Sequence, residues 1–353
     1  MSATFHLDPV SLREVADSEQ EATEHADRLL ARYRAQATNP AEQRAIAPEL
    51  IQWLRISGQT GRAEEVARTA FARVGPSGGL DLLEDPEPSS LSFEQISPGL
   101  RLATAMQWNS EPGEERFGQA RALFDLCVSS AQALAFGVPP VDPAAALLLA
   151  ISLQHRGKMR LASHDIFGAL RDINLALTYR LQFGAAKDQL ESSEFAVAAL
   201  ISQLEAAIEE RNLASGASIE TETFAAGDRS GFGAVEGTHR TGPWLFWLRT
   251  GRLKAFGSYH ADMLEGPWYW FREQGSLLQE GAFVANQQHG PWTRYYANGN
   301  RLDQGSFDHG VKTGVWTSFN EDGTVKATVK KKAIKAPEPK TKLGQIASAL
   351  RRT

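Results

Sequence analysis

The spacing of apolar residues changes once along the chain. Before about Ser215 the apolar residues recur three and four positions apart, alanine is abundant and runs of β-branched residues are rare, a pattern that predicts amphipathic helices. From about Phe224 glycine and aromatic residues dominate, and apolar residues alternate with polar ones, as in short β-strands. The expected fold class is therefore α+β, a helical N-terminal half followed by a sheet.

Two pairs of predicted helices share a spacing of small residues around a glycine. We interpret the glycine as the end of one helix, with the small residues that follow allowing the next helix to pack closely. Asn39-Pro40 and Asp142-Pro143 each predict a helix start, with an N-cap side chain followed by proline at the first helical position. The residues that share the spacing are Gly58, Ala63, Ala67 and Ala70 in the first pair, and Gly157, Ala162, Ile166 and Ala169 in the second.

This spacing resembles the tetratricopeptide repeat (TPR), a helix–turn–helix unit, and the resemblance implies a TPR-like α-helical array over residues 1–213. The aromatic residue that often comes early in that repeat is replaced by Ala47 and Ala146. A generic bundle of helical hairpins explains the same spacing, because small residues occur wherever helices pack closely. Both interpretations remain open.

The second half contains a strict 24-residue repeat. A Gly-Pro-Trp triplet begins at Gly242, Gly266 and Gly290, and Gly314-Val315-Trp316 continues the series without insertions. A further glycine follows nine residues after each of the four starts, and another follows fifteen residues after each of the first three. Projecting back by one period reaches a degenerate first copy that has Glu220 in place of tryptophan. A period of this length predicts stacked copies of one supersecondary unit.

Each copy is predicted to be one antiparallel hairpin. Asn298-Gly299 and Asp322-Gly323 are strong hairpin-turn signals, because glycine readily adopts the positive φ that these turns need. Alternation along a strand places Trp244 on one face and Trp247 on the other. A single-layer sheet built in this way cannot bury both faces, so we expect one of them to be covered by the helices, by another chain or by a ligand.

These columns resemble the MORN repeat in its 24-residue bacterial variant: Gly-x-Trp-x-x-aromatic, then Gly-x-Leu, then Gly-x-aromatic, over residues 227–323. The resemblance implies a single-layer antiparallel sheet that contacts proteins, dimerises or associates with membrane lipid. Some bacterial relatives of this variant are called antitoxins. An antitoxin-like or protease-regulated component of a bacterial conflict system is therefore an alternative function.

The aromatic columns are the candidate partner-binding surface. Filling the stack of hairpins explains any single aromatic residue, so the functional interpretation applies to a face as a whole. The candidate residues are Trp244, Trp247, Trp268, Trp270, Phe271, Trp292, Tyr295, Tyr296, Trp316 and Phe319.

The C-terminal segment is basic although the chain has a net charge of −5. Lys330, Lys331, Lys332 and Lys335 are candidate contacts for an anionic partner, and a short amphipathic helix is predicted after them. A peripheral membrane protein that uses this tail is a further alternative. We favour a protein partner over lipid because the segment lacks a bulky aromatic residue, and we do not expect nucleic acid to be the partner.

The sequence offers no catalytic or metal-binding motif. Cys127 is the only cysteine, and the histidines have no metal-ligand spacing. The glycine-rich segment 230–237 lacks the strand and helix that a dinucleotide site requires. No basic and apolar leader opens the chain, and no apolar run is long enough to span a bilayer, so we expect a cytoplasmic protein.

The expected domains are helices over 1–213, a linker over 214–223, the repeat sheet over 224–329 and a basic tail over 330–353. Both halves are repeat-like surfaces. The expected function is that of an adaptor or scaffold, not an enzyme and without cofactor or metal, that binds a protein partner of unknown identity through the sheet, the helices or both. Homodimerisation through the sheet is also expected from the resemblance.

Overall fold

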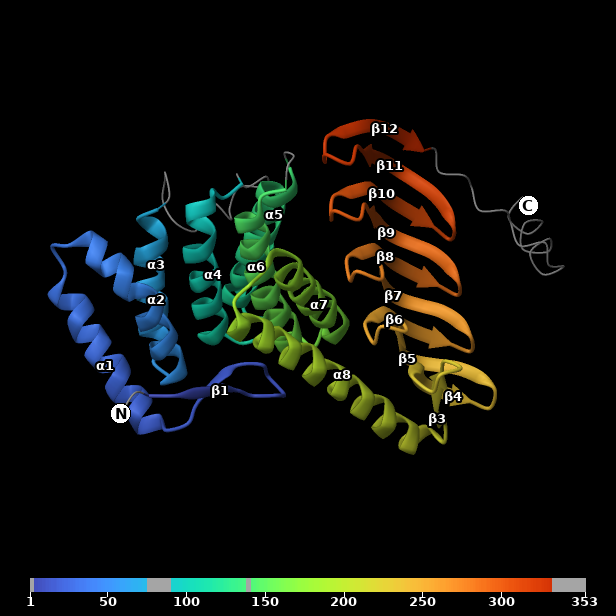
Figure 1. Ribbon diagram of the computed structural model, residues 1–353, viewed down its shortest axis with the longest axis horizontal. Helices are drawn as coiled ribbons and strands as arrows, with labels where there is room; N and C mark the ends of the chain where they lie inside the picture. Colours follow the sequence, from blue (N-terminus) through green and yellow to red (C-terminus); the bar gives the residue numbers. More distant parts are fainter. Residues whose placement is uncertain (1–2, 75–89, 138–140, 332–353) are drawn as a thin grey trace, which may run out of the picture.

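A computed structural model describes residues 3–74, 90–137 and 141–331 of this chain. Helices fill the N-terminal half and a sheet fills the C-terminal half (Figure 1). The expected α+β class is therefore confirmed. Among the described residues, no helix combines the length and apolarity that crossing a membrane demands.

The helices pack mainly against their neighbours in sequence, as an array of antiparallel pairs does. Asn39 and Asp142 cap two of them as predicted, with Asn39 Oδ1 accepting from the Glu42 amide at 3.3 Å and Asp142 Oδ1 from the Ala144 amide at 2.9 Å. The described helices are α1 (Glu19–Ala35), α2 (Pro40–Ile56), α3 (Thr60–Ala72), α4 (Phe93–Trp108), α5 (Glu115–Phe136), α6 (Pro143–Ala162), α7 (Ile166–Phe183) and α8 (Lys187–Ser215).

The two glycines of the helical spacing have different roles. Gly58 follows the end of α2 with a φ of 75°, as expected for a residue that terminates a helix. Gly157 lies inside α6, where a Cβ atom would come within 2.5 Å of Ile173 Cγ1 on α7. The expectation that Gly157 ends a helix is therefore wrong. Its small size instead allows α6 and α7 to approach closely.

A short N-terminal hairpin, β1 (Phe5–Leu7) with β2 (Glu14–Ala16), was not predicted. It places Glu14 against the helices, where its carboxylate lies 3.5 Å from Arg55 Nη1 and 3.6 Å from Lys158 Nζ. Three-residue strands are too short for alternation to reveal them, so the sequence pattern carried no signal for this hairpin.

Within the described part of the chain the sheet has ten antiparallel strands in sequence order, so each strand pairs with its neighbours along the chain. Figure 1 shows the hairpins stacked from β3 to β12 beside the helices. The strands are β3 (Ser218–Thr223), β4 (Arg229–Glu236), β5 (His239–Trp247), β6 (Leu253–His260), β7 (Met263–Phe271), β8 (Leu277–Val284), β9 (Gln287–Tyr295), β10 (Arg301–Asp308), β11 (Val311–Phe319) and β12 (Val325–Lys331).

Two domain boundaries differ from those expected. Residues 214–223 do not form a linker, because they contain the end of α8 and all of β3. The sheet also extends past 329, since β12 continues to Lys331 and so includes Lys330. Lys332, Lys335 and the predicted amphipathic helix lie outside the described residues.

The outer face of the sheet, which points away from the helices, carries a ladder of tryptophans that explains the repeat. The Trp268 ring lies over Gly257, where a Cβ atom would be 2.2 Å from the ring, and its indole nitrogen donates to the Ser258 carbonyl at 3.0 Å. Trp244, Trp292 and Trp316 make the equivalent contacts. In the degenerate first copy, Glu220 lies on β3 and pairs with Gly233 of β4. Because β3 is the edge strand of the described sheet, no earlier strand lies beside it for a tryptophan to cover.

The opposite face of the sheet, the helix-facing face, packs on the helical half. Leu245, Trp247 and Phe256 are buried in the same continuous core as the helices, and Phe256 stacks on Phe167 of α7 with ring centroids 5.8 Å apart. Trp247 belongs to this core, whereas Trp244 stacks on Phe246 of the outer face, so their predicted alternation between faces is confirmed. Of the covers that the sequence left open, the helices of the same chain take this face.

Candidate functional site: a polar cleft between helices and sheet

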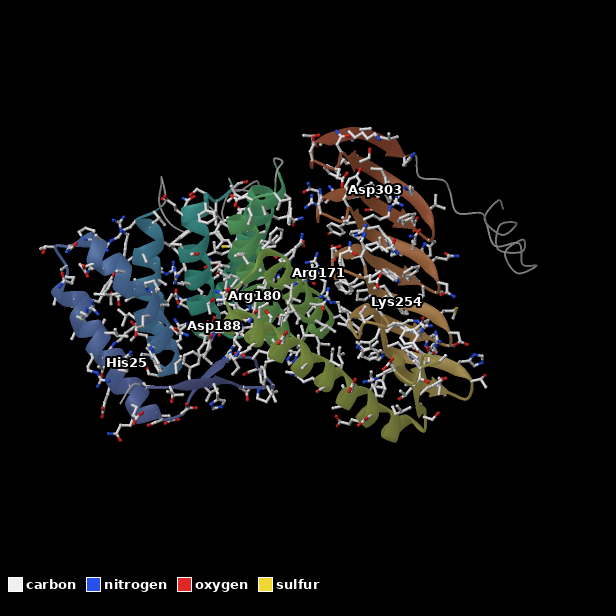
Figure 2. All side chains as sticks on the ribbon, viewed as in Figure 1. His25, Arg171, Arg180, Asp188, Lys254 and Asp303 are labelled. Atoms are coloured by element: carbon white, nitrogen blue, oxygen red, sulfur yellow. The ribbon has the colours of Figure 1, made fainter. Side chains whose placement is uncertain are left out.

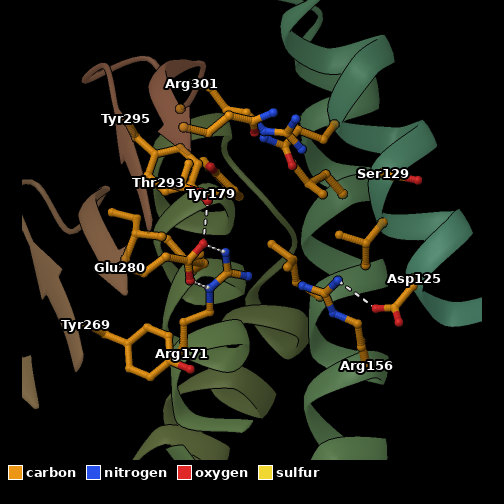
Figure 3. Close-up of a pocket in the computed structure, with 18 of the residues that line it drawn as sticks. Asp125, Ser129, Arg156, Arg171, Tyr179, Tyr269, Glu280, Thr293, Tyr295 and Arg301 are labelled. Atoms are coloured by element: carbon orange, nitrogen blue, oxygen red, sulfur yellow. Dashed lines mark hydrogen bonds and ion pairs between the residues drawn. The ribbon is translucent and has the colours of Figure 1, made fainter. Parts of the chain in front are cut away.

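A cleft of about 340 Å³ lies between the helix-facing face of the sheet and helices α5, α6 and α7 (Figure 3). Its volume is within the range of small-ligand sites. Its polar lining comes from both halves of the chain: Asp125, Ser129, Gln132, Arg156, Arg160, Arg171 and Tyr179 on the helices, and Tyr269, Glu280, Thr293, Tyr295, Arg301 and Gln304 on the sheet.

The sheet supplies this lining from repeat positions that are apolar elsewhere. Phe256 is fully buried, but the residue 24 positions later is Glu280 and the next copy has Gln304. Leu277 is buried in the core, and its equivalent one repeat later is Arg301. The helix-facing face is therefore apolar where the helices pack on it and polar where the cleft opens. The polar character of the cleft therefore comes from which residues occupy these repeat positions, because the backbone register of the strands does not change.

Asp172 on α7 holds two arginine side chains of the cleft in place. Its side chain is fully buried, with Oδ2 lying 2.7 Å from Arg156 Nε and Oδ1 lying 2.6 Å from Arg171 Nη1. Burial alone would raise the pKa of Asp172, but Arg156 and Arg171 outweigh it and hold that pKa well below its usual range. The carboxylate therefore stays charged and fixes both guanidinium groups.

A two-pronged ion pair joins the two halves across the cleft. Arg171 lies on the side of the helices that faces the sheet (Figure 2), and it contacts Glu280 through Nε at 3.1 Å and Nη2 at 3.0 Å. Tyr295 donates its hydroxyl hydrogen to the same carboxylate. Burial, followed by the charge of Glu280, raises the pKa of Tyr295 above its usual range. This tyrosine therefore acts as a neutral donor.

Arg301 differs from the other arginines of the cleft. Arg156 and Arg171 are paired, and Arg160 Nε lies 3.4 Å from Asp172 Oδ2. Arg301 is exposed, and no carboxylate of the described residues lies within 4.0 Å of its guanidinium. The positive charge of Arg301 is therefore available to a group from outside the chain.

A second hollow of about 230 Å³ adjoins the cleft. The two share Ser129, Gln132 and Arg301, and the second continues past Asn300 to Phe319. Together they form an elongated groove between helices α5 to α7 and strands β7 to β11. Because the groove is elongated, it suits an extended segment better than a compact molecule.

The arginine and tyrosine side chains of the cleft keep their protons near neutral pH. Arginine remains protonated at all ordinary pH values. Burial raises the pKa of Tyr179 to about 12, and burial followed by Glu280 raises that of Tyr269 to about 12. These groups therefore offer fixed hydrogen-bond donors near neutral pH. Cys127 is also inert, because burial raises the pKa of its thiol.

The predicted partner-binding residues lie in three environments. Trp244, Trp268, Trp292 and Trp316 are buried in the ladder on the outer face, where Trp270 is half-buried beside them. Trp247 and Phe271 are buried against the helices. Tyr295 lines the cleft and Phe319 the adjoining hollow, while the half-buried Tyr296 donates to the Phe319 carbonyl at 2.9 Å. Their role in binding a partner stays a prediction.

Sequence reasoning missed the polar residues of the cleft. Glu280 and Arg301 carry a signal in the repeat alignment, because each replaces an apolar residue of a preceding copy. Arg171 has no such signal, since only the docking of α7 on the sheet brings it to Glu280. Lys330 and Lys331, predicted as contacts for an anionic partner, lie exposed on the edge strand β12, away from the cleft.

Comparison with known proteins supports the repeat. A family model described as a MORN repeat variant matches residues 288–309, which cover β9 except for its first residue and all of β10. No curated protein matches the chain. No solved structure matches it either. A MORN repeat suggests a role in protein interaction or membrane binding, whereas the TPR-like and antitoxin-like resemblances stay predictions.

Proposed function

We propose that this protein is a non-catalytic adaptor that holds an acidic, extended segment of a protein partner in the groove between its helices and its sheet. The observation that carries the proposal is the change of the repeat from Leu277 to Arg301 where the groove opens. The partner of an antitoxin-like or protease-regulated protein would be a toxin or a protease, so those roles are special cases of the same activity.

The chemistry of the groove favours an anionic guest. The guanidinium group of Arg301 presents several N–H donors in one plane, an arrangement that matches a carboxylate. Gln132, Ser129 and Gln304 lie along the same groove and add neutral hydrogen-bonding groups. The other arginines are already paired with Asp172, Asp125 and Glu280. They line the groove, but their charges are balanced within the chain.

The test uses Arg301→Leu, which restores the residue type of the two preceding repeats and should therefore leave the fold intact. Arg252→Leu removes the same charge from an exposed turn of the same sheet and is the matched control. An array of acidic, neutral and basic ten-residue peptides is probed with the full chain. We expect acidic peptides to bind the unchanged protein and the control variant, and to bind Arg301→Leu about tenfold or more weakly, as loss of a charged hydrogen bond implies.

Two results would contradict this proposal. One is equal binding of acidic peptides by Arg301→Leu and Arg252→Leu. The other is an unchanged protein that shows no preference for acidic over basic peptides. Circular dichroism at 222 nm shows whether both variants keep the helical half folded.

A peripheral membrane role is the second candidate, and strand β12 is the observation that favours it. This edge strand exposes Lys326, Lys330 and Lys331 beside Val325 and Val329, a mixture of basic and apolar groups that attracts anionic lipid. Flotation with vesicles rich in phosphatidylserine tests it, comparing the full chain with a Lys326→Glu, Lys330→Glu variant. Failure of the unchanged protein to float with the vesicles would end this candidate.

A further inference from the structure

Three metal-ligating side chains converge at one end of the sheet, away from the groove. His289 lies on β9, Asp308 ends β10, and His309 begins the turn to β11. One nitrogen or oxygen atom from each side chain lies within 4.8 Å of the other two. His309 Nδ1 is 2.7 Å and His289 Nδ1 is 3.7 Å from Asp308 Oδ1, and the two imidazole rings have centroids 4.8 Å apart.

The 24-residue register creates this meeting point. One hairpin earlier, a Glu265 carboxylate oxygen accepts from the Ala285 amide at 2.9 Å. Glu265 and Ala285 occupy the same repeat positions as His289 and His309, so the fold brings these two positions together in both copies. Asp308 likewise occupies the position of Val284. Three potential ligands therefore replace residues that could not form such a set.

A histidine–carboxylate pair alone would not indicate a metal site. His239 and Asp262, at a hairpin end two copies earlier, form such a pair at 2.5 Å, and among the described residues no second imidazole completes a set of three ligands there. The His289 cluster differs because His289 Nδ1 is closed off from solvent and has no hydrogen-bond partner among the described residues. The His289 side chain as a whole is 42% exposed, so the buried nitrogen is the part aimed at Asp308 and His309. A polar atom left in this state costs free energy unless a further group satisfies it.

We propose that His289, Asp308 and His309 bind a divalent transition-metal ion of the zinc class. Two imidazole nitrogens and a carboxylate oxygen are a donor set that zinc accepts, with water in the fourth position. Metal–ligand bonds near 2.0–2.1 Å in a tetrahedral site place ligand atoms roughly 3.3 Å apart. The separations of 2.7 and 3.7 Å from Asp308 lie on either side of that value, so small rotations of exposed side chains complete the site.

Two features set the metal preference and the independence of this site. Imidazole ligands disfavour Mg²⁺ and Ca²⁺, which prefer sites built from oxygen. The cluster uses no residue of the groove, so it stands or falls separately from the proposed adaptor function.

The experiment is a calorimetric titration of the full chain with ZnCl₂ after treatment with a chelator. His289→Ala and His309→Ala each remove one ligand, whereas His239→Ala removes an imidazole from the histidine–aspartate pair two copies earlier and is the matched control. We expect one Zn²⁺ to bind per chain in the unchanged protein and in the control. Either ligand variant should bind zinc about tenfold or more weakly. Removing a residue that only hydrogen-bonds a metal ligand already weakens metal binding by about tenfold, and removing the ligand itself should cost at least as much. MgCl₂ in excess should not displace the zinc.

The proposal is overturned if the unchanged protein takes up no zinc, if the two ligand variants bind as it does, or if Mg²⁺ competes equally. Circular dichroism shows whether the alanine variants remain folded. If either one does not, Asp308→Asn decides, because it preserves the size of the side chain and removes only its charge. Undiminished binding by Asp308→Asn would then also contradict the site.

Discussion

At the scale of single residues, steric exclusion requires a glycine beneath each tryptophan of the outer face. The indole ring of Trp292 occupies the volume that any side chain at position 281 would need, since a Cβ atom there would lie 2.2 Å from the ring. The tryptophan ring is enclosed by its neighbours and cannot move aside. Glycine and tryptophan must therefore change together, and this constraint is the physical origin of two columns of the repeat.

We predict that Gly281→Ala lowers the free energy of unfolding by about 1–3 kcal/mol, the usual effect of forcing extra volume into a packed site. Urea denaturation followed by tryptophan fluorescence measures it. Gly118→Ala is the control, because a Cβ atom there meets nothing within 4 Å and the residue lies inside α5. That variant should be slightly more stable than the unchanged protein. Equal stability of the two variants would contradict the steric account.

Glu14 shows how a buried charge makes stability depend on pH. Burial would raise its pKa, but the charges of Lys158 and Arg55 outweigh burial and lower the pKa from 4.5 to about 2. A carboxyl group whose pKa is lower in the folded state stabilises the fold at pH values above its unfolded pKa, and this contribution is lost as pH falls toward the folded value. For Glu14 the loss occurs between about pH 4.5 and pH 2.

We predict that Glu14→Gln destabilises the protein near pH 6 by on the order of 3 kcal/mol, the free-energy equivalent of the pKa shift. The difference from the unchanged protein should shrink as pH falls below 4.5, because protonation of Glu14 then removes the same interaction. Urea unfolding at several pH values measures this difference. A difference that stays constant from pH 6 to pH 3 would show that Glu14 contributes through packing instead of charge.

At the scale of elements, α7 and β8 are joined by the Arg171–Glu280 pair. Both side chains are largely buried, with exposures of 12% and 24%, and the contact is two-pronged. Such a pair adds little over apolar packing, but removing one partner leaves the other buried without its counter-charge. Its main effect is therefore to fix how the sheet docks on the helices and so to set the shape of the groove.

We predict that Glu280→Gln lowers the free energy of unfolding by about 1–3 kcal/mol, less than for a fully buried pair because Arg171 keeps its contact with Asp172. Glu273→Gln makes the same change on an exposed turn and should have no measurable effect. Chemical denaturation of both variants measures the difference. If the two variants are equally stable, the pair across the cleft does not hold the halves together.

At the scale of the whole molecule, the helical half and the sheet share one continuous core. Residues of α1 to α8 and of the helix-facing face of the sheet belong to a single buried cluster, whereas the tryptophan ladder forms a second one on the outer face. Neither half can separate without exposing residues such as Leu245 and Phe256 to water. This shared burial favours unfolding as one unit.

We predict that helix and sheet unfold in a single transition. Circular dichroism at 222 nm follows the helices. Tryptophan fluorescence follows the sheet, because only Trp53 and Trp108 of the eight tryptophans lie in the helical half. The two signals should have the same urea midpoint. A sheet signal that changes at a lower urea concentration than the helix signal would mean that the halves are separate domains.

The sequence by itself determined the fold class, the hairpin register and the alternation of aromatic residues between the two faces. These features depend on local φ and ψ preferences and on a period of 24 residues, both of which are written directly in the order of residues. The same register also contains the approach of His289 to His309, because equivalent positions of neighbouring copies meet in space.

Only the tertiary structure decided what covers the sheet and where the groove lies. Helices of the same chain take the helix-facing face, a result that the repeat pattern left open. Arg171 reaches Glu280 across 109 positions of sequence, and Gly157 packs against Ile173 instead of ending a helix. Contacts of this kind depend on how folded elements pack against one another, which no periodicity encodes. The physical reason is that local spacing sets elements, whereas burial between them selects their arrangement.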